Sequence, residues 1–338
     1  MKECVNLILE WYLDNKRFLP WRMDLDPYHV WISEIMLQQT RIEAVIPYYQ
    51  RFMERIPTIQ ALSEIDEDQL LKLWEGLGYY TRARNLKKAA ITIMEKYGGV
   101  FPREYQEILS LPGIGEYTAG AISSICFQAK EVCVDGNVMR VYCRIQNLDL
   151  DVSNIKVKKE ISLQLKKILP EDSGSFNQGI MELGEVICIP NGQAKCEICP
   201  LQRKCKAHLL GKENSIPRKI QKKEKKEEIY TIFILQYQDK FAIRKREEGL
   251  LNNMWEFPTE KGKFTLSQVK KKFPQNLCIK KAVTYQHIFT HKKWILYSYY
   301  IEVSTMIEHY SWVSLEKIEK DYALPGAFQP IYTFLQKK

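Results

Sequence analysis

A turn that carries two glycines between two helical segments constrains the fold of this chain most. It lies in residues 111–120, which read Leu-Pro-Gly-Ile-Gly-Glu-Tyr-Thr-Ala-Gly. The apolar pattern predicts one helix over 103–110 and a second over 118–127. Gly113 and Gly115 allow positive φ and close approach of another chain, and the amides after Gly115 open the second helix, where anions bind well. The stretch predicts either a corner whose glycines only cap helices or a turn that holds a phosphate.

The run Leu-Pro-Gly-Ile-Gly-x-x-Thr-Ala resembles the helix-hairpin-helix motif of the DNA glycosylases related to endonuclease III. In that family the hairpin amides grip a DNA phosphate, and an aspartate follows the second helix. The matching aspartate is Asp135, in the Val-Asp-Gly-Asn segment 134–137. The resemblance implies that Asp135 stabilises a cationic sugar, while Asn137 and Tyr117 order the site.

A glutamate stands inside an apolar helix predicted over residues 26–40, which Asp-Pro opens well. Glu34 is flanked by Trp31, Ile35 and Leu37. Partial desolvation would raise the pKa of this carboxyl and let it hold a proton near neutral pH, as a general acid must. A solvated helix glutamate is the alternative. The segment Trp-Ile-Ser-Glu-Ile-Met-Leu-Gln-Gln-Thr resembles the catalytic-acid segment of the MutY adenine glycosylases, which implies that Glu34 is the acid.

Two tyrosines and two arginines crowd residues 76–85, which read Gly-Leu-Gly-Tyr-Tyr-Thr-Arg-Ala-Arg-Asn. Such rings can wedge into a disturbed base stack while guanidinium groups meet phosphates, or they can pack in a core. The run resembles the MutY family closely. That resemblance implies that Gln39, Thr40 and Tyr79 contact the DNA, with Gln39 and Tyr79 probing it at the lesion.

The sequence predicts another helix whose first part is residues 176–184. In it, the amide of Gln178 and the carboxylate of Glu182 lie one helical turn apart. Both can face one pocket. An adenine edge offers donors and acceptors that such a pair can match, whereas hydration on a helix surface is the plain alternative.

Four of the nine cysteines are closely spaced as C-x7-C-x2-C-x5-C, at Cys188, Cys196, Cys199 and Cys205. Four thiolates at this spacing predict a metal site, and both zinc and a [4Fe-4S] cluster are compatible with them. The loop resembles the cluster loop of the endonuclease III class, usually C-x6-C-x2-C-x5-C, with a first gap one residue longer. The resemblance implies a [4Fe-4S] cluster.

The length of 338 residues favours two domains, and the charge of +9 suits a polyanionic partner. The N-terminus reads as an amphipathic helix and not as a signal peptide, and no apolar run is long enough to span a membrane. We expect a soluble, cytoplasmic monomer, associated with the nucleoid when bound to DNA.

The chain divides by composition into a helical domain over 1–210, a polar linker over 211–228 and a second domain over 229–338. In the second domain, alternating and β-branched segments predict strands at 229–235, 240–243 and 294–301, and helices at 266–273 and 329–335. This α+β domain resembles the Nudix-like domain of the MutY family. It lacks the Glu-rich box that would bind magnesium, so we expect no pyrophosphate hydrolysis.

Phe289, Thr290 and His291 precede the predicted strand 294–301. A ring, a hydroxyl and an imidazole in succession can pack on a nucleotide, or they can form an ordinary turn into the strand. The matching loop in the MutY family reads Phe-Ser-His and recognises 8-oxoguanine. Thr290 keeps the hydroxyl and adds a methyl group.

The sequence thus predicts a mainly α helix-hairpin-helix glycosylase domain with a Cys4 metal loop, followed by the Nudix-like domain. It resembles the adenine DNA glycosylases, which implies removal of adenine opposite 8-oxoguanine or guanine by base flipping and acid-assisted hydrolysis, without lyase activity. An endonuclease III-like lyase for oxidised pyrimidines is one rival, although it needs an amine where Tyr117 stands. A non-catalytic DNA-binding protein is the other.

Overall fold

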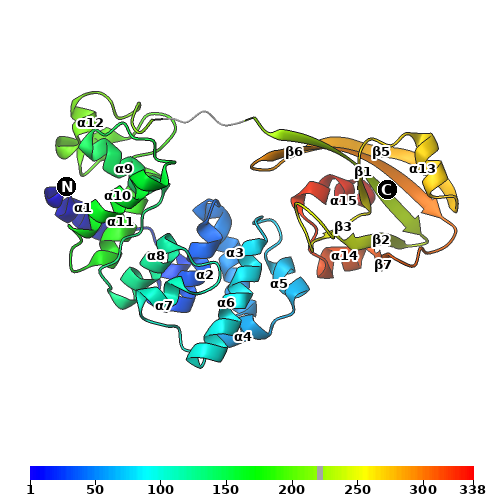
Figure 1. The fold of residues 1–338 in the computed structure, drawn as a ribbon, viewed down its shortest axis with the longest axis horizontal. Coiled ribbons are helices and arrows are strands. Elements are labelled where there is room, and N and C mark those ends of the chain that lie inside the picture. The colour runs from blue at the N-terminus through cyan, green and yellow to red at the C-terminus, as the bar shows by residue number, and fades with distance from the viewer. Residues whose placement is uncertain (219–223) are drawn as a thin grey trace. The chain divides into compact units, whose positions relative to one another are not determined.

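A computed structural model describes residues 1–218 and 224–338 of the chain (Figure 1). The chain separates into two compact units. The first comprises residues 1–64 and 85–221, and the second comprises 65–84 and 222–338.

Within its described residues, the first unit builds its regular structure from helices. The helices up to the end of the hairpin are α1 (Lys2–Asn15), η1 (Pro20–Arg22), α2 (Pro27–Leu37), α3 (Ile42–Arg55), α4 (Ile59–Glu64), α6 (Thr81–Tyr97, which begins in the second unit), α7 (Tyr105–Leu109) and α8 (Glu116–Phe127). Those that follow are α9 (Gly136–Gln146), α10 (Ile155–Lys166), α11 (Ser173–Val186), η2 (Cys196–Ile198), η3 (Gln202–Lys204) and α12 (Lys206–Leu209). Helix α11 packs against α1, α8 and α9, while α2 packs against α8. These contacts bring α2, which carries Glu34, next to the second helix of the hairpin.

The second unit contains α5 (Glu67–Leu73) and a mixed sheet. Its later elements are β1 (Lys226–Tyr237), β2 (Lys240–Lys245), β3 (Trp255–Glu256), β4 (Thr259–Lys261), α13 (Leu266–Lys272), β5 (Asn276–Ile288), β6 (Lys292–Val303), β7 (Ser311–Ser314), α14 (Leu315–Asp321), η4 (Gly326–Phe328) and α15 (Gln329–Gln336). The order β3-β2-β1-β6-β5 places the parallel pair β1 and β6 at the centre, with antiparallel neighbours on both sides.

Both faces of this sheet are covered, because residues of β1 alternate between two cores. Ile232 and Ile234 pack on the side of α15, with Ile331, whereas Phe233 and Leu235 pack with α13. In Figure 1, α14 and α15 lie beside the sheet in red. The predicted α+β class and the three predicted strands are confirmed. The sequence did not predict β5, because the polar and exposed positions along it hide the strand pattern.

The described parts of the predicted linker 211–228 are more ordered than expected. Ile216 is buried in the core of the first unit, and its carbonyl accepts a 2.8 Å hydrogen bond from Nε of Arg144. At the other end, Lys226 already pairs with β6. Residues 219–223 lie outside the described residues. One buried apolar side chain and three strand residues are too few to reveal ordered structure in a segment with many charges. The domain boundaries at 210 and 229 stay a prediction.

One helix end differs from the predicted one. Helix α2 ends at Leu37 and not at Thr40, so Gln39 and Thr40 lie in the turn that follows. Helix α3 contains Pro47 in its interior, where the missing amide removes one hydrogen bond to the preceding turn. Among the described residues, no helix is long and apolar enough to cross a membrane.

Candidate active site

The hairpin joins α7 to α8, as predicted, but its two glycines differ. Gly113 has φ +78°, and a Cβ built there would lie 2.6 Å from Cβ of Asn85, so this position requires glycine. Gly115 is the N-cap of α8 at φ −101°, with open space around a Cβ. Gly115 therefore does not use the positive φ that glycine allows. Its exposed side remains open to a close approach from outside the chain.

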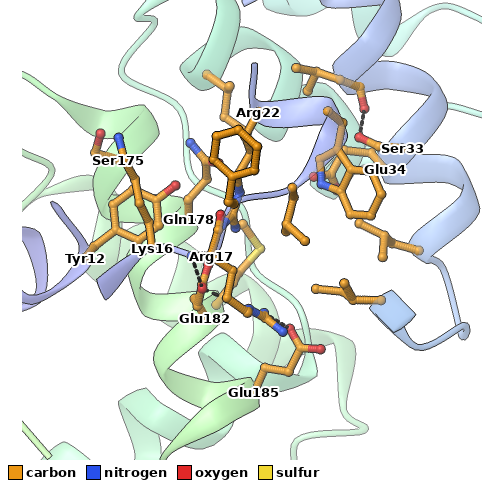
Figure 2. Close-up of a pocket in the computed structure, with 18 of the residues that line it drawn as sticks. Tyr12, Lys16, Arg17, Arg22, Ser33, Glu34, Ser175, Gln178, Glu182 and Glu185 are labelled. Carbon is orange, nitrogen blue, oxygen red and sulfur yellow. Dashed lines mark hydrogen bonds and ion pairs between the residues drawn. The ribbon is translucent and has the colours of Figure 1, made fainter. Parts of the chain in front are cut away.

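A cavity of about 540 Å³ opens between the helices of the first unit (Figure 2). Its lining includes all four residues that the sequence singled out as catalytic, Glu34, Tyr117, Asp135 and Asn137, together with Thr40, Gln178 and Glu182. Segments more than a hundred residues apart in sequence thus converge on one site.

Glu34 is the buried acid of this cavity. Asp26 caps α2 by accepting a 2.8 Å hydrogen bond from the amide of Tyr28, which fixes the start of the helix. The Glu34 side chain lies among apolar neighbours and the residue is only 9% exposed. Burial raises the pKa of Glu34 to about 7; a hydrogen bond with Tyr117 works against the rise, and the nearby charge of Asp135 adds to it. The carboxyl therefore holds a proton close to neutral pH, as a general acid requires.

Asp135 is the second carboxyl of the site and the N-cap of α9. Its Oδ1 accepts from the amide of Val138 at 2.8 Å, and its Oδ2 accepts from Nδ2 of Asn137 at 3.0 Å. Burial raises the pKa of Asp135, while the hydrogen bond from Val138 and the charge of Arg140 oppose that rise. The charge of Asp135 in turn helps to raise the pKa of Glu34.

Arg140 is a site residue that the sequence reading missed. It donates to Oδ1 of Asn137 at 2.8 Å and to the carbonyls of Gly184 and Cys188 at 2.7 and 2.8 Å. Through these bonds Arg140 orients the amide that in turn holds Asp135, and it ties α9 to the end of α11. Its place three residues after Asn137 on one helix was the available signal.

Tyr117 lies at the start of α8, between the two acids. Its hydroxyl donates to Sδ of Met181 at 3.0 Å, and it is also a hydrogen-bond partner of Glu34. Burial raises the pKa of Tyr117 well above its ordinary value, and the charges of Glu34 and Asp135 add to the effect. The phenol is neutral at physiological pH and can orient the acid.

The sequence predicted that Glu182 could meet an adenine edge, but in the structure its carboxylate is already engaged by two arginines. Its side chain is 1% exposed, and Oε1 accepts from both the amide and Nε of Arg17 at 2.9 Å. Its other oxygen, Oε2, accepts from Nη1 of Arg22 at 2.5 Å. Figure 2 shows both arginines reaching Glu182, and Arg17 reaching Glu185. Glu182 thus fixes the segment from Arg17 to Arg22, whereas Gln178 lines the cavity half-buried.

The four spaced cysteines line one small cavity of the first unit, together with Arg144 and His208. Nη1 of Arg144 donates to Sγ of Cys188 at 3.2 Å. Burial raises the pKa of Cys196 to about 11 and that of Cys199 to about 12. Thiols in such surroundings become thiolates only against a bound cation, so the donor set fits a four-thiolate metal centre.

His208 and Glu213 add further donors beside Cys196, with ligand atoms of all three within 4.8 Å of one another. The cysteine spacing alone gave no sign of these two residues.

Gln39 and Tyr79 both have left-handed backbones, at φ 61° and 48°, a conformation that costs free energy in residues other than glycine. Gln39 is exposed in the turn after α2. Tyr79 belongs to the second unit, is 48% exposed, and its hydroxyl pairs with that of Thr290. Tyr80 is buried, so core packing explains that ring.

Phe289, Thr290 and His291 form the turn between β5 and β6. The amide of Phe289 donates to the carbonyl of Lys292 at 2.8 Å, and its ring packs edge-on against Trp294 at 4.8 Å. Thr290 and His291 are exposed. The ring therefore anchors the turn, which presents the hydroxyl and the imidazole to solvent.

Two protein families match parts of this chain. The HhH-GPD superfamily of base excision DNA repair proteins matches residues 32–171, and the NUDIX domain matches residues 230–333. An adenine DNA glycosylase of Buchnera aphidicola subsp. Baizongia pistaciae is 42% identical over 258 residues, which cover 74% of this chain and 72% of that protein. Another, from Buchnera aphidicola subsp. Acyrthosiphon pisum, is 37% identical over 290 residues, or 84% and 82% of the two chains.

Among solved structures, a thermostable thymine-DNA glycosylase superposes with a TM-score of 0.57 and 29% identity. The match covers 62% of this chain and 96% of the other. The helical fold is thus shared with a DNA glycosylase of known structure.

Proposed function

The chain belongs to the adenine DNA glycosylase family of base excision repair, and we propose that it removes adenine paired with 8-oxoguanine or guanine in duplex DNA. The observation that carries the proposal is the buried Glu34, whose pKa is raised to about 7, in one cavity with Asp135 and Tyr117. The bond to be broken lies inside a duplex, so the adenosine must first be flipped out of the stack.

In the proposed reaction, Glu34 donates its proton to a ring nitrogen of adenine. The C–N bond then breaks, its electron pair leaves with the neutral adenine, and positive charge develops on the deoxyribose. Water adds to C1′ of the sugar and gives up a proton to the Glu34 carboxylate, which restores the acid. Tyr117, which stays protonated, keeps the acid oriented toward the base.

Asp135 would act as a carboxylate beside the sugar. It stabilises charge that exists only in the transition state, so its effect falls on the rate and not on binding. Asn137 holds Oδ2 of Asp135, and Arg140 holds Asn137. Glu34 and Asp135 are thus held by different helices, Glu34 by α2 and Asp135 by the start of α9.

The proposal includes a [4Fe-4S] cluster held by Cys188, Cys196, Cys199 and Cys205. When bound, such a cluster cross-links its loop and carries redox-active iron. The support is that all four thiols line one cavity and that their spacing, C-x7-C-x2-C-x5-C, resembles that of the endonuclease III class in its last two gaps. Protein purified from cells with adequate iron should contain iron and sulfide in equal amounts, whereas stoichiometric zinc without iron would contradict the cluster.

For DNA reading we propose two groups of contacts. The amides from Gly115 onward, at the start of α8, take a phosphate in the turn that Gly113 permits, while Gln39, Thr40 and Tyr79 probe the duplex at the mispair. The strained backbones of Gln39 and Tyr79 support this role, because such strain is often kept where function needs it.

The exposed turn of the second unit would read the lesion base. Thr290 and His291 present a hydroxyl and an imidazole that can hydrogen-bond 8-oxoguanine, and Phe289 anchors the turn. Replacing both Thr290 and His291 with alanine should weaken discrimination of 8-oxoguanine from guanine while leaving excision measurable. Unchanged discrimination would mean that this turn does not read the lesion.

The rival lyase activity needs an amine nucleophile, and the hairpin offers Tyr117 instead, a phenol held neutral by burial. The decisive experiment measures adenine release from duplexes with 8-oxoguanine, guanine or cytosine opposite the adenine. The expected result is release opposite 8-oxoguanine and guanine without strand cleavage, and none by Glu34→Gln. Normal release by Glu34→Gln would refute the assignment of the acid.

A further inference from the structure

An exposed phenylalanine stands at the rim of the active-site cavity. Phe18 is 86% exposed, the highest value among the exposed large hydrophobic side chains of the described residues. It lines the same cavity as Glu34 and Asp135. A ring left in water at this place has a large apolar surface that a ligand can cover.

The ring cannot fold back into the core, because the chain is fixed on both sides of it. Arg17 is held through its amide and Nε by Glu182, and through Nη2 by Glu185 at 2.7 Å. On the other side, Leu19 is 4% exposed, and its carbonyl accepts from the amide of Arg22 at 2.9 Å. The clamp by Glu182 thus holds Phe18 outward at the cavity mouth.

We infer that Phe18 packs its ring on the extrahelical adenine as that base occupies the cavity, and so helps to retain it beside Glu34. This inference rests on the proposed excision of adenine. An aromatic ring offers a π-face that any nucleobase can stack on, whereas it gives nothing to a phosphate. The neighbouring Lys16, which also lines the cavity, is the side chain suited to the backbone.

The inference separates base contact from backbone contact, and the test uses that difference. Affinity is measured in the Glu34→Gln background, which binds without cutting, for two duplexes with 8-oxoguanine opposite the site. One duplex carries adenine, and the other carries a tetrahydrofuran abasic analogue. Because stacking on a base is lost only where a base exists, Phe18→Ala should weaken binding of the adenine duplex about 5- to 100-fold and leave the abasic duplex unchanged.

Two further variants control the measurement. Phe18→Trp should restore the preference for the adenine duplex, since it supplies another ring. Ile155→Ala removes a side chain that is 71% exposed at the start of α10, outside the cavity lining, and should change neither affinity.

Equal weakening of both duplexes by Phe18→Ala, or no weakening of either, would overturn the inference, because the ring would then act on the backbone or on nothing. Adenine release by the protein with Glu34 intact is measured in the same duplex. Absence of release would refute the proposed function, whereas normal release with unchanged adenine-dependent affinity refutes only the role of Phe18.

Discussion

Glu34→Gln should make the first unit more stable at alkaline pH while removing its activity. Burial raises the pKa of Glu34 from 4.5 to about 7, so the folded state binds this proton more tightly than the unfolded state. Stability from this group is complete below pH 4.5 and is lost as the pH rises to 7. Above pH 7 the loss amounts to about 3 kcal/mol, at 1.36 kcal/mol per pKa unit. Glutamine imitates the protonated carboxyl and avoids this loss.

The measurement is urea unfolding of wild type and Glu34→Gln at pH 5 and pH 8. Hydrogen exchange in peptides from α2 reports the unfolding of the first unit. All other titrating groups are present in both proteins, so their contributions to the pH dependence cancel, except where they interact with Glu34. The free energy of unfolding of Glu34→Gln relative to wild type should therefore increase by about 2.5 kcal/mol between the two pH values. Glu54→Gln, an exposed change on α3, is the control and should show no such increase. A difference between wild type and Glu34→Gln that does not change with pH would refute the buried-acid argument.

Three further results are expected. The single-turnover rate of adenine release should fall as the pH rises above about 7, where Glu34 loses its proton; a rate that keeps rising would point to another acid. Gly113→Ala should lower the free energy of unfolding by about 1 to 3 kcal/mol, because φ is +78° and a Cβ meets Asn85, whereas Gly115→Ala should leave stability nearly unchanged in the same denaturation assay. Glu182→Gln should lower the free energy of unfolding by about 2 to 3 kcal/mol, because it breaks two ion pairs of a buried carboxylate; this value is discounted for the partial exposure of the arginines. Thermal unfolding measures the change, and an unchanged midpoint would contradict the role of Glu182 in holding Arg17 and Arg22.

Local patterns in the sequence were sufficient to predict the hairpin between α7 and α8 and the burial of Glu34. The surroundings of Glu34 predicted desolvation because a helix surrounds each side chain with neighbours three and four positions away, and those neighbours are apolar. The Asp-Pro start of α2 could be read in the same way.

Contacts between distant segments could not be read from the sequence. Glu182 and Arg17 are 165 positions apart, and nothing in either neighbourhood shows that they form an ion pair. The same holds for the carbonyl of Ile216, which accepts from Arg144 inside a segment whose charges predicted a linker. Such partners are set by how helices pack, and packing depends on the whole core.

The sequence by itself determined the chemistry available to this protein: a carboxyl in an apolar helix, an aspartate after a glycine hairpin, four spaced thiols and a turn with a ring, a hydroxyl and an imidazole. These depend on side-chain type and on spacing within a few helical turns, which local geometry fixes. Only the tertiary structure decided which groups share a cavity and which are already engaged. In the folded protein Glu34 and Asp135 line one cavity, Glu182 binds Arg17, and Phe18 is exposed at the mouth of that cavity. The packing of α11 against α1 and α9 sets the distances between these groups.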